Sequence, residues 1–244
     1  MLQRGFVFVW CVLACSVPWL SGCADVGTDP LMPGKLRALQ AGTDPTISQG
    51  LRHNQVGVAH LDAHDYDAAI SEFDQAAALD PANYGIYVNR GIAYTRRHQY
   101  DLAGRDFDEA RRLNPDSFAA SYGRATVWLR KGNFDQAIGD LDRALGQKPD
   151  LWGHFPDDGL LLSPYGRALW NRAKAHSAEK DYTSAIADYD RAIQLDRPSA
   201  PLFYGRGIAK RRIGDVTGAD ADLESARQLD PNVERHYADW EVTP

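Results

Sequence analysis

The sequence predicts an all-α fold, an α-solenoid of stacked helical hairpins, from a fixed repeat period and from two helical apolar patterns within each period. Residues at two places in the period recur every 34 positions: Ala69, Ala103 and Ala137, and Pro81, Pro115 and Pro149. The same step resumes after one insertion, from Ala185 to Ala219. A period of this length is typical of identical units that stack on their neighbours and do not close around a single core.

Residues 84–117 show how one unit is built. The first apolar stripe at helical spacing consists of Tyr84, Tyr87, Gly91 and Tyr94. After a break at His98 and Gln99, a second stripe consists of Tyr100, Ala103, Phe107, Ala110 and Leu113. Asn114 and Pro115 then stop the pattern. Each unit is therefore predicted to hold two antiparallel helices followed by a turn.

Small and bulky residues occupy fixed places in the two helices. The small residues are Gly57, Gly91, Ala125, Ala173 and Gly207 in the first helix, and Ala76, Ala110, Ala144, Ala192 and Ala226 in the second. The bulky partners are Tyr66, Tyr100, Phe134, Tyr182 and Val216, then Phe73, Phe107, Leu141, Tyr189 and Leu223. With these residues and the recurrent proline, residues 50–231 resemble the tetratricopeptide repeat family. The resemblance implies a right-handed solenoid of five units, at 50–83, 84–117, 118–151, 166–199 and 200–233.

Two segments lie outside the repeat pattern. Residues 152–165, between the third and fourth units, are rich in apolar side chains. We expect this insertion either to fold back and fill a gap in the stack or to form a lip on the binding groove. After Pro231, apolar side chains at helical spacing predict that residues 233–244 hold a helix that caps the last unit, and a short tail.

Residues 1–22 predict a secretory signal peptide, because Arg4 precedes an apolar run that is too short to span a bilayer comfortably. Residues 20–23, Leu-Ser-Gly-Cys, resemble the lipobox of bacterial lipoproteins, which implies that Cys23 becomes the acylated first residue of the mature chain. The other two cysteines lie within the removed segment, so acylation would also remove an unpaired exported thiol. A plain cleaved signal and a retained anchor are the alternatives.

Residues 23–49 predict a flexible tether, because Gly-Thr-Asp-Pro occurs in them twice. A tether behind a lipid anchor would hold the repeat domain at a membrane of the bacterial cell envelope. By resemblance to lipoprotein sorting in enteric bacteria, Ala24 after the cysteine favours the outer membrane, facing the periplasm.

Charge is separated between the two helices of each unit. The first helices of units two to five carry a surplus of Lys and Arg, and the second helices are acidic. Four arginines share one place in the period, each followed sixteen residues later by an aspartate: Arg90, Arg124, Arg172 and Arg206, with Asp106, Asp140, Asp188 and Asp222. We interpret these as Arg–Asp pairs that bridge helices within or between units, with ligand contact as the alternative. The first unit has Val56 in place of the arginine.

Particular places of the first helices line the concave groove in this family. Here they hold Val88, Ile92, Arg96, Tyr122, Thr126, Arg130, Arg167, Trp170, Lys174, Tyr204, Ile208, Arg211 and Arg212. Aromatic side chains rimmed by arginine favour an extended peptide with apolar and acidic groups, unless the aromatics only pack on neighbouring helices. The subfamily that clamps a terminal carboxylate uses Lys and Asn at two of these places. Pairs such as Tyr122 and Thr126 argue against that clamp.

Catalytic and cofactor motifs are missing from the sequence. It contains no Gly-rich phosphate loop, no nucleophile motif and no HExxH pattern, so we expect neither enzymatic activity nor a cofactor. His53, His60 and His64 could share one helix face, but this is an incomplete ligand set, and we expect no metal site. A net charge of −6 gives no support to a nucleic-acid partner.

These features together predict a membrane-anchored scaffold of the cell envelope that recruits other proteins. By its general layout, it resembles envelope lipoproteins of this repeat family that assist pilus or secretion assembly or recruit cell-wall enzymes. Two alternatives stay open: a lipoprotein with a metal or small-molecule site, and a structural component that self-associates through its repeat ends.

Overall fold

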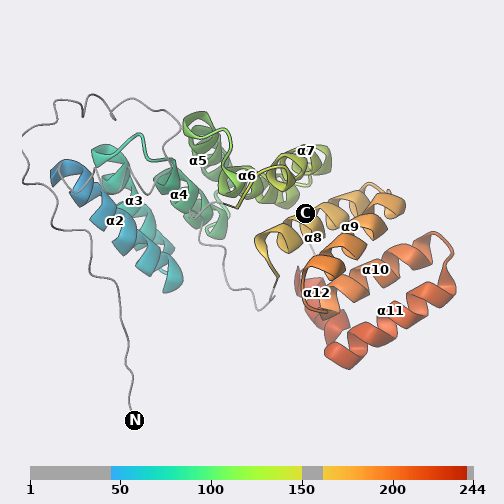
Figure 1. Ribbon diagram of the computed structural model, residues 1–244. Coiled ribbons are helices and arrows are strands. Elements are labelled where there is room, and N and C mark those ends of the chain that lie inside the picture. Colours follow the sequence, from blue (N-terminus) through green and yellow to red (C-terminus); the bar gives the residue numbers. More distant parts are fainter. Residues whose placement is uncertain (1–44, 150–161, 241–244) are drawn as a thin grey trace, which may run out of the picture. The chain divides into compact units, whose positions relative to one another are not determined.

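The computed structural model describes residues 45–149 and 162–240, and in these ranges helices alternate with short turns and no strand occurs (Figure 1). The helices are α2 (Pro45–Asp62), α3 (Tyr66–Leu79), α4 (Tyr84–Arg96), α5 (Tyr100–Leu113), α6 (Phe118–Arg130), α7 (Phe134–Leu145), α8 (Pro164–Ala178), α9 (Tyr182–Leu195), α10 (Ala200–Arg212), α11 (Val216–Leu229) and α12 (Val233–Trp240). The signal peptide, Cys23 and most of the expected tether lie outside the described residues. The helix α2 begins five residues before the expected start of the first unit.

The predicted all-α solenoid is confirmed. Five hairpins, α2 with α3, α4 with α5, α6 with α7, α8 with α9 and α10 with α11, each pack on the next. The helix α7 packs on α8, so the third and fourth units remain in contact across the insertion. The short α12 packs on α10 and buries Val233 fully, which confirms the predicted cap.

The turn between the helices of every unit adopts the same backbone conformation. One residue per unit lies in the left-handed region, at φ values between 57° and 89°: His64, His98, Gly132, Lys180 and Gly214. Glycine enters this region without strain, whereas a side chain makes it unfavourable. Only two of the five units have glycine there, so residue type alone is a weak indicator of this turn.

The predicted contacts between small and bulky residues are present in the core. A Cβ atom on Gly91 would lie 2.9 Å from Phe107 Cε1, and one on Gly57 would lie 2.5 Å from Phe73 Cε1. Gly123 also approaches Phe107, and a Cβ atom on it would lie 2.3 Å from Cε1. Phe107 is therefore held between the first helices of two successive units, α4 and α6.

Most of the insertion falls outside the described residues, which resume at Leu162. The side chain of Leu162 is buried and joins an apolar cluster with Leu169, Trp170 and Leu202. Pro164 then begins α8, with Ser163 as its N-cap. The choice between a space-filling segment and a lip concerns residues 150–161, and both interpretations stay predictions.

Candidate functional site

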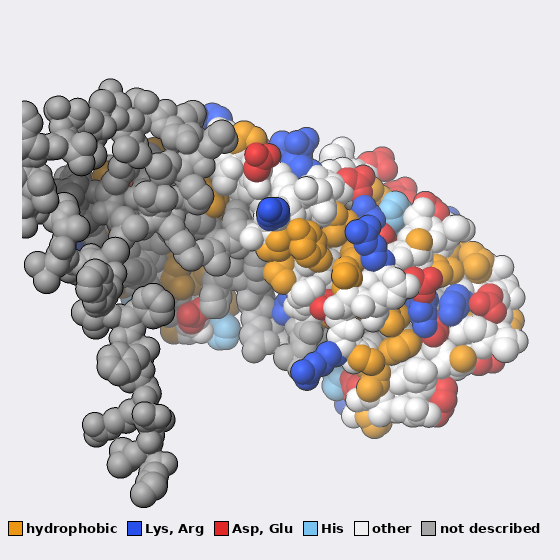
Figure 2. Space-filling model, viewed as in Figure 1, with side chains coloured by type: hydrophobic (Ala, Val, Ile, Leu, Met, Phe, Trp, Pro, Cys, Tyr) orange, Lys and Arg blue, Asp and Glu red, His pale blue; other side chains and the backbone are white. Residues whose placement is uncertain are grey.

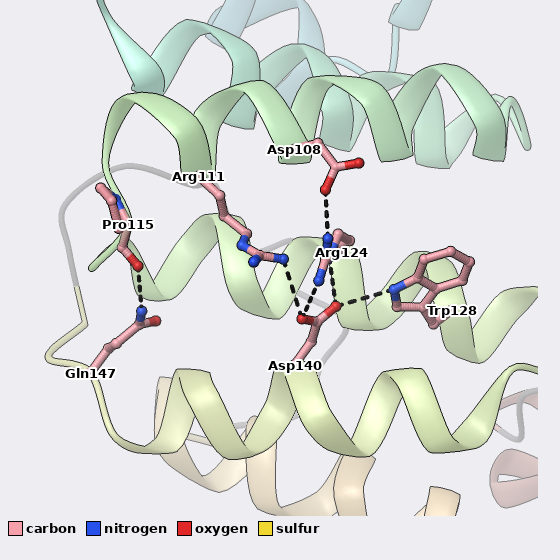
Figure 3. A network of polar contacts seen from close by, with 7 residues as sticks. All are labelled: Asp108, Arg111, Pro115, Arg124, Trp128, Asp140 and Gln147. Carbon is pink, nitrogen blue, oxygen red and sulfur yellow. Dashed lines mark hydrogen bonds and ion pairs between the residues drawn. The ribbon is translucent and has the colours of Figure 1, made fainter.

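An arginine on α6 joins the second helices of two successive units. The Nε and Nη2 atoms of Arg124 donate to Asp140 on α7 at 2.7 Å and 2.6 Å. Its Nη1 atom donates to Asp108 on α5 at 2.6 Å. Figure 3 shows the guanidinium between the two carboxylates. This fork geometry is the one in which arginine binds carboxylates most strongly.

The same arrangement repeats at every junction between described units. The arginines and their two acceptors are Arg90 with Asp106 and Asp74, Arg172 with Asp188 and Asp142, and Arg206 with Asp222 and Asp190. In each case, the first carboxylate belongs to the arginine's own unit and the second to the preceding unit. The predicted Arg–Asp pairs are therefore confirmed, and they bridge helices both within and between units. We call this set of contacts the Arg–Asp ladder.

The aspartates of the ladder differ in electrostatic environment. Burial raises the pKa of Asp106 and outweighs the hydrogen bond from Arg90, which acts in the opposite direction. Burial alone would also raise the pKa of Asp222. Hydrogen bonds from Arg206 and Lys210 outweigh that effect and lower it, since Asp222 faces two cations, with Lys210 Nζ at 2.8 Å.

The first described unit ends the ladder. Val56 stands at the arginine's place on α2 and is 44% exposed. No unit precedes α2 among the described residues, so an arginine there would lack its second carboxylate. Glu72, which lies where later units have the buried aspartate, instead contacts His53 Nδ1 at 2.7 Å.

A second set of arginines is exposed and has no partner among the residues that the structure describes. Arg96, Arg130 and Arg212 lie at one place in the period, at the ends of α4, α6 and α10. None of them makes an ion pair or hydrogen bond through its side chain with the rest of the described chain. Their neighbours Arg97 and Lys131 pair with Asp67 and Asp101 of the preceding unit. We call the unpaired set the exposed arginine row.

The face of the molecule shown in Figure 2 has no large basic patch. On the face shown in Figure 2, Lys and Arg side chains are scattered among hydrophobic and acidic ones. A partner that recognises charge would therefore be selected by the position of particular arginines rather than by a general positive field.

Several of the predicted groove residues are engaged within the fold. Val88 and Trp170 are buried, and Lys174 Nζ lies 4.2 Å from the centre of the Trp170 ring. The Tyr204 ring lies 4.8 Å from that of Tyr237 on the capping helix. These aromatic side chains therefore contact neighbouring parts of the protein.

Some of the charged residues predicted to line the groove also bind within the fold. Arg211 pairs with Asp220 on α11 at 2.6 Å, and Arg167 Nε donates to the carbonyl oxygen of Leu162 at 3.3 Å. Among the other predicted residues, Tyr122, Ile92, Thr126 and Ile208 are partly exposed, and the arginines of the exposed arginine row are exposed.

Side-chain hydrogen bonds tie successive first helices together beneath this face. Asn89 Nδ2 donates to Asn54 Oδ1 at 3.1 Å, and Asn171 Nδ2 donates to the hydroxyl of Tyr122 at 2.9 Å. Sequence reasoning missed these contacts. The available signal was an asparagine at the same place in two units, Asn89 and Asn171.

His53 and His60 of the first unit lie next to different carboxylates. His53 contacts Glu72, and His60 Nδ1 lies 3.8 Å from Asp65. Across the described ranges, no group of three or more His, Cys, Asp or Glu side chains is arranged to hold a metal ion. In the same ranges, no helix combines the length and apolar composition required to cross a bilayer.

Comparison with family models identifies the class of protein that this repeating geometry defines. Two models described as tetratricopeptide repeat match the chain, one at residues 57–107 and 88–151 and the other at residues 166–198. Together they cover just over half of the chain. The chain belongs to the tetratricopeptide repeat (TPR) family.

Curated relatives match over short segments. The chain is 32% identical over 83 residues to the Hsp70-Hsp90 organizing protein of Triticum aestivum, which covers 34% of this chain and 14% of that protein. It is 33% identical over 69 residues to the protein SGT1 homolog of Oryza sativa subsp. japonica, which covers 28% and 19% of the two chains. The similarity thus spans less than a fifth of either relative.

Solved structures with the same fold cover more of the chain. MamA 41-end from Desulfovibrio magneticus RS-1 superimposes with a TM-score of 0.62 at 18% identity, over 75% of this chain and 96% of that one. YrrB, described as a TPR protein with an unusual peptide-binding site, gives 0.59 at 17% identity, over 84% and 96%. At these identities, the likeness shows the fold alone.

Proposed function

We propose that this chain is a lipid-anchored scaffold of the bacterial cell envelope, which recruits partner proteins by binding an extended segment with acidic and apolar groups. The observation that carries the proposal is the exposed arginine row, Arg96, Arg130 and Arg212. Almost every other arginine or lysine on the first helices has a carboxylate, carbonyl or ring partner, so these three charges remain for a ligand.

The surroundings of the row set the chemistry of the partner. Ile92, Thr126 and Ile208 lie four residues before the three arginines, on the same helix faces, and are half-buried. Apolar groups of a bound segment would contact these side chains, and its carboxylates would meet the arginines. Exposed ion pairs contribute only about 0.2–1 kcal/mol each, so we expect the arginines to set specificity and association rate more than affinity.

Family membership supports binding of proteins as the general role. Repeats of this kind present extended surfaces to partner segments. Relatives named as an organizing protein and as a peptide-binding TPR protein are in keeping with that role. Neither defines the partner of this chain.

In-cell crosslinking tests the proposed binding face. A photoreactive amino acid at Thr126 should crosslink to a partner, and the double substitution Arg96→Glu and Arg130→Glu should reduce the yield several-fold. The matched control is Arg105→Glu with Arg191→Glu, which changes net charge equally on exposed second-helix positions. Equal crosslinking in both double variants would refute recognition by the row.

The membrane anchor requires its own test, because Cys23 and the signal peptide lie outside the described residues. We expect a fatty-acid analogue fed to cells to label the full chain and the protein to sediment with membranes. Cys23→Ser should abolish both labelling and sedimentation. Membrane association that survives without labelling would rule out acylation as the anchor.

A further inference from the structure

Arg111 on α5 breaks the pattern of the units around it. At the same place in the period, three other units have apolar side chains that pack against the core: Ala77, Leu145 and Ile193. In the last unit, Arg227 pairs with Glu234 of the capping helix. Arg111 is only 22% exposed, so a charged group here gives up both solvation and the apolar contact that its counterparts make.

The hydrogen bonding of Arg111 does not compensate for that burial. Within the described chain, its guanidinium makes one side-chain contact, from Nη1 to Asp140 Oδ1 at 3.4 Å. Both oxygens of Asp140 already accept shorter bonds from Arg124, and Oδ2 also accepts from Trp128 Nε1 at 3.1 Å. Figure 3 shows Arg111 reaching from α5 toward a carboxylate that Arg124 holds from the other side.

The charges around Arg111 leave a local positive excess. Arg143 lies one helical turn after Asp140 on α7, and it is exposed and has no ion-pair partner in the described chain. Arg143 thus adds a third positive charge to those of Arg111 and Arg124 in a region where the carboxylates of Asp108 and Asp140 carry two negative charges. Burial, followed by the charges of Arg124 and Arg143, lowers the pKa of Arg111.

We propose that Arg111 and Arg143 form a binding site for a phosphate-type oxyanion at the junction of α5 and α7. A tetrahedral dianion would supply the acceptors that the Arg111 fork lacks, and its charge would offset the excess. The same chemistry is offered by free inorganic phosphate and by the phosphomonoester of a modified side chain. The site lies between second helices and is separate from the exposed arginine row.

Thermal unfolding of the full chain in inorganic phosphate tests this site, with chloride at matched ionic strength as reference. At a phosphate concentration ten times its dissociation constant, we expect the Tm to rise by about 3–6 °C. Arg111→Leu introduces an apolar side chain, as three of the other units have at this place. It should remove the phosphate-induced shift in Tm and leave the Tm in chloride unchanged or higher. Arg143→Gln should reduce the shift. Arg112→Leu, an exposed neighbour paired with Glu109, should keep it.

Two results would overturn the proposal. One is an equal phosphate shift in Arg111→Leu, which would indicate general salt stabilisation. The other is a Tm in chloride that falls by more than about 5 °C in Arg111→Leu, which would make Arg111 a structural partner of Asp140. Phenyl phosphate distinguishes the ligand sources: a shift equal to that of inorganic phosphate supports a phosphorylated partner, and a shift from inorganic phosphate alone supports the free anion.

Discussion

Replacing Asp140 with asparagine should destabilise the repeat domain far more than the same change at Asp108, although both residues bind Arg124. The Asp140 side chain is 5% exposed and that of Asp108 is 60% exposed. Asp140→Asn removes a buried charge and turns an amide N–H toward a guanidinium that can only donate. Breaking a buried pair costs about 3–5 kcal/mol. Arg124 is 22% exposed and keeps its bond to Asp108. We therefore expect Asp140→Asn to lower the unfolding free energy by about 2–4 kcal/mol.

Urea unfolding followed by far-UV circular dichroism at pH 7 measures this difference. For a domain of this size, the expected loss corresponds to a fall in Tm of about 5–15 °C. Asp108→Asn should cost less than about 1 kcal/mol, as exposed ion pairs do. The double variant Arg124→Met with Asp140→Asn should recover part of the loss, which gives a coupling free energy above about 0.5 kcal/mol.

Equal destabilisation by the two aspartate substitutions would contradict this prediction. Similar unfolding free energies for Asp108→Asn and Asp140→Asn would mean that burial does not set the strength of the ladder contacts. A coupling free energy near zero would mean that Asp140 acts through something other than Arg124.

Three further predictions concern glycines, the turns and pH. Gly123→Ala should lower the unfolding free energy by about 1–2 kcal/mol, because the added Cβ would lie 2.3 Å from Phe107. A Cβ on Gly139 would meet nothing within 4 Å, so Gly139→Ala should raise the unfolding free energy by about 1 kcal/mol in the same urea assay. Lys180→Gly should raise it by about 0.5–1 kcal/mol by relieving a φ of 64°, and a loss of stability measured by thermal unfolding would refute this. Because the pKa of Asp222 is lowered in the folded state, its contribution is present above the ordinary aspartate pKa of about 3.9 and is lost as pH falls through the lower folded value. Asp222→Asn should therefore flatten the fall in Tm between pH 5 and pH 2, and an unchanged pH profile would contradict the assignment.

Much of the fold could be read from the sequence, because a 34-residue period and a helical stripe determine which side of each helix is buried. The pairing of Arg124 with Asp140 was predicted on this basis, since sixteen residues carry the chain around one turn and back along the neighbouring helix. The use of the candidate face for binding stays a prediction. Periodicity placed Tyr122, Trp170 and Tyr204 on it. In the structure, the hydroxyl of Tyr122 accepts from Asn171, Trp170 is buried, and Tyr204 lies against Tyr237 of the capping helix.

The sequence by itself determined the repeats, the helices and the partner of each ladder arginine within its own unit. Only the tertiary structure decided that Asp108 of the preceding unit completes the site of Arg124. It also decided that, among residues 45–149 and 162–240, Arg97 is paired while Arg96 is not, and that Arg111 has one long hydrogen bond there. The physical reason is that contacts within a hairpin follow from spacing along the chain. Contacts between hairpins depend on how closely and at what rotation two units pack, and bulky side chains such as Phe107 set that distance.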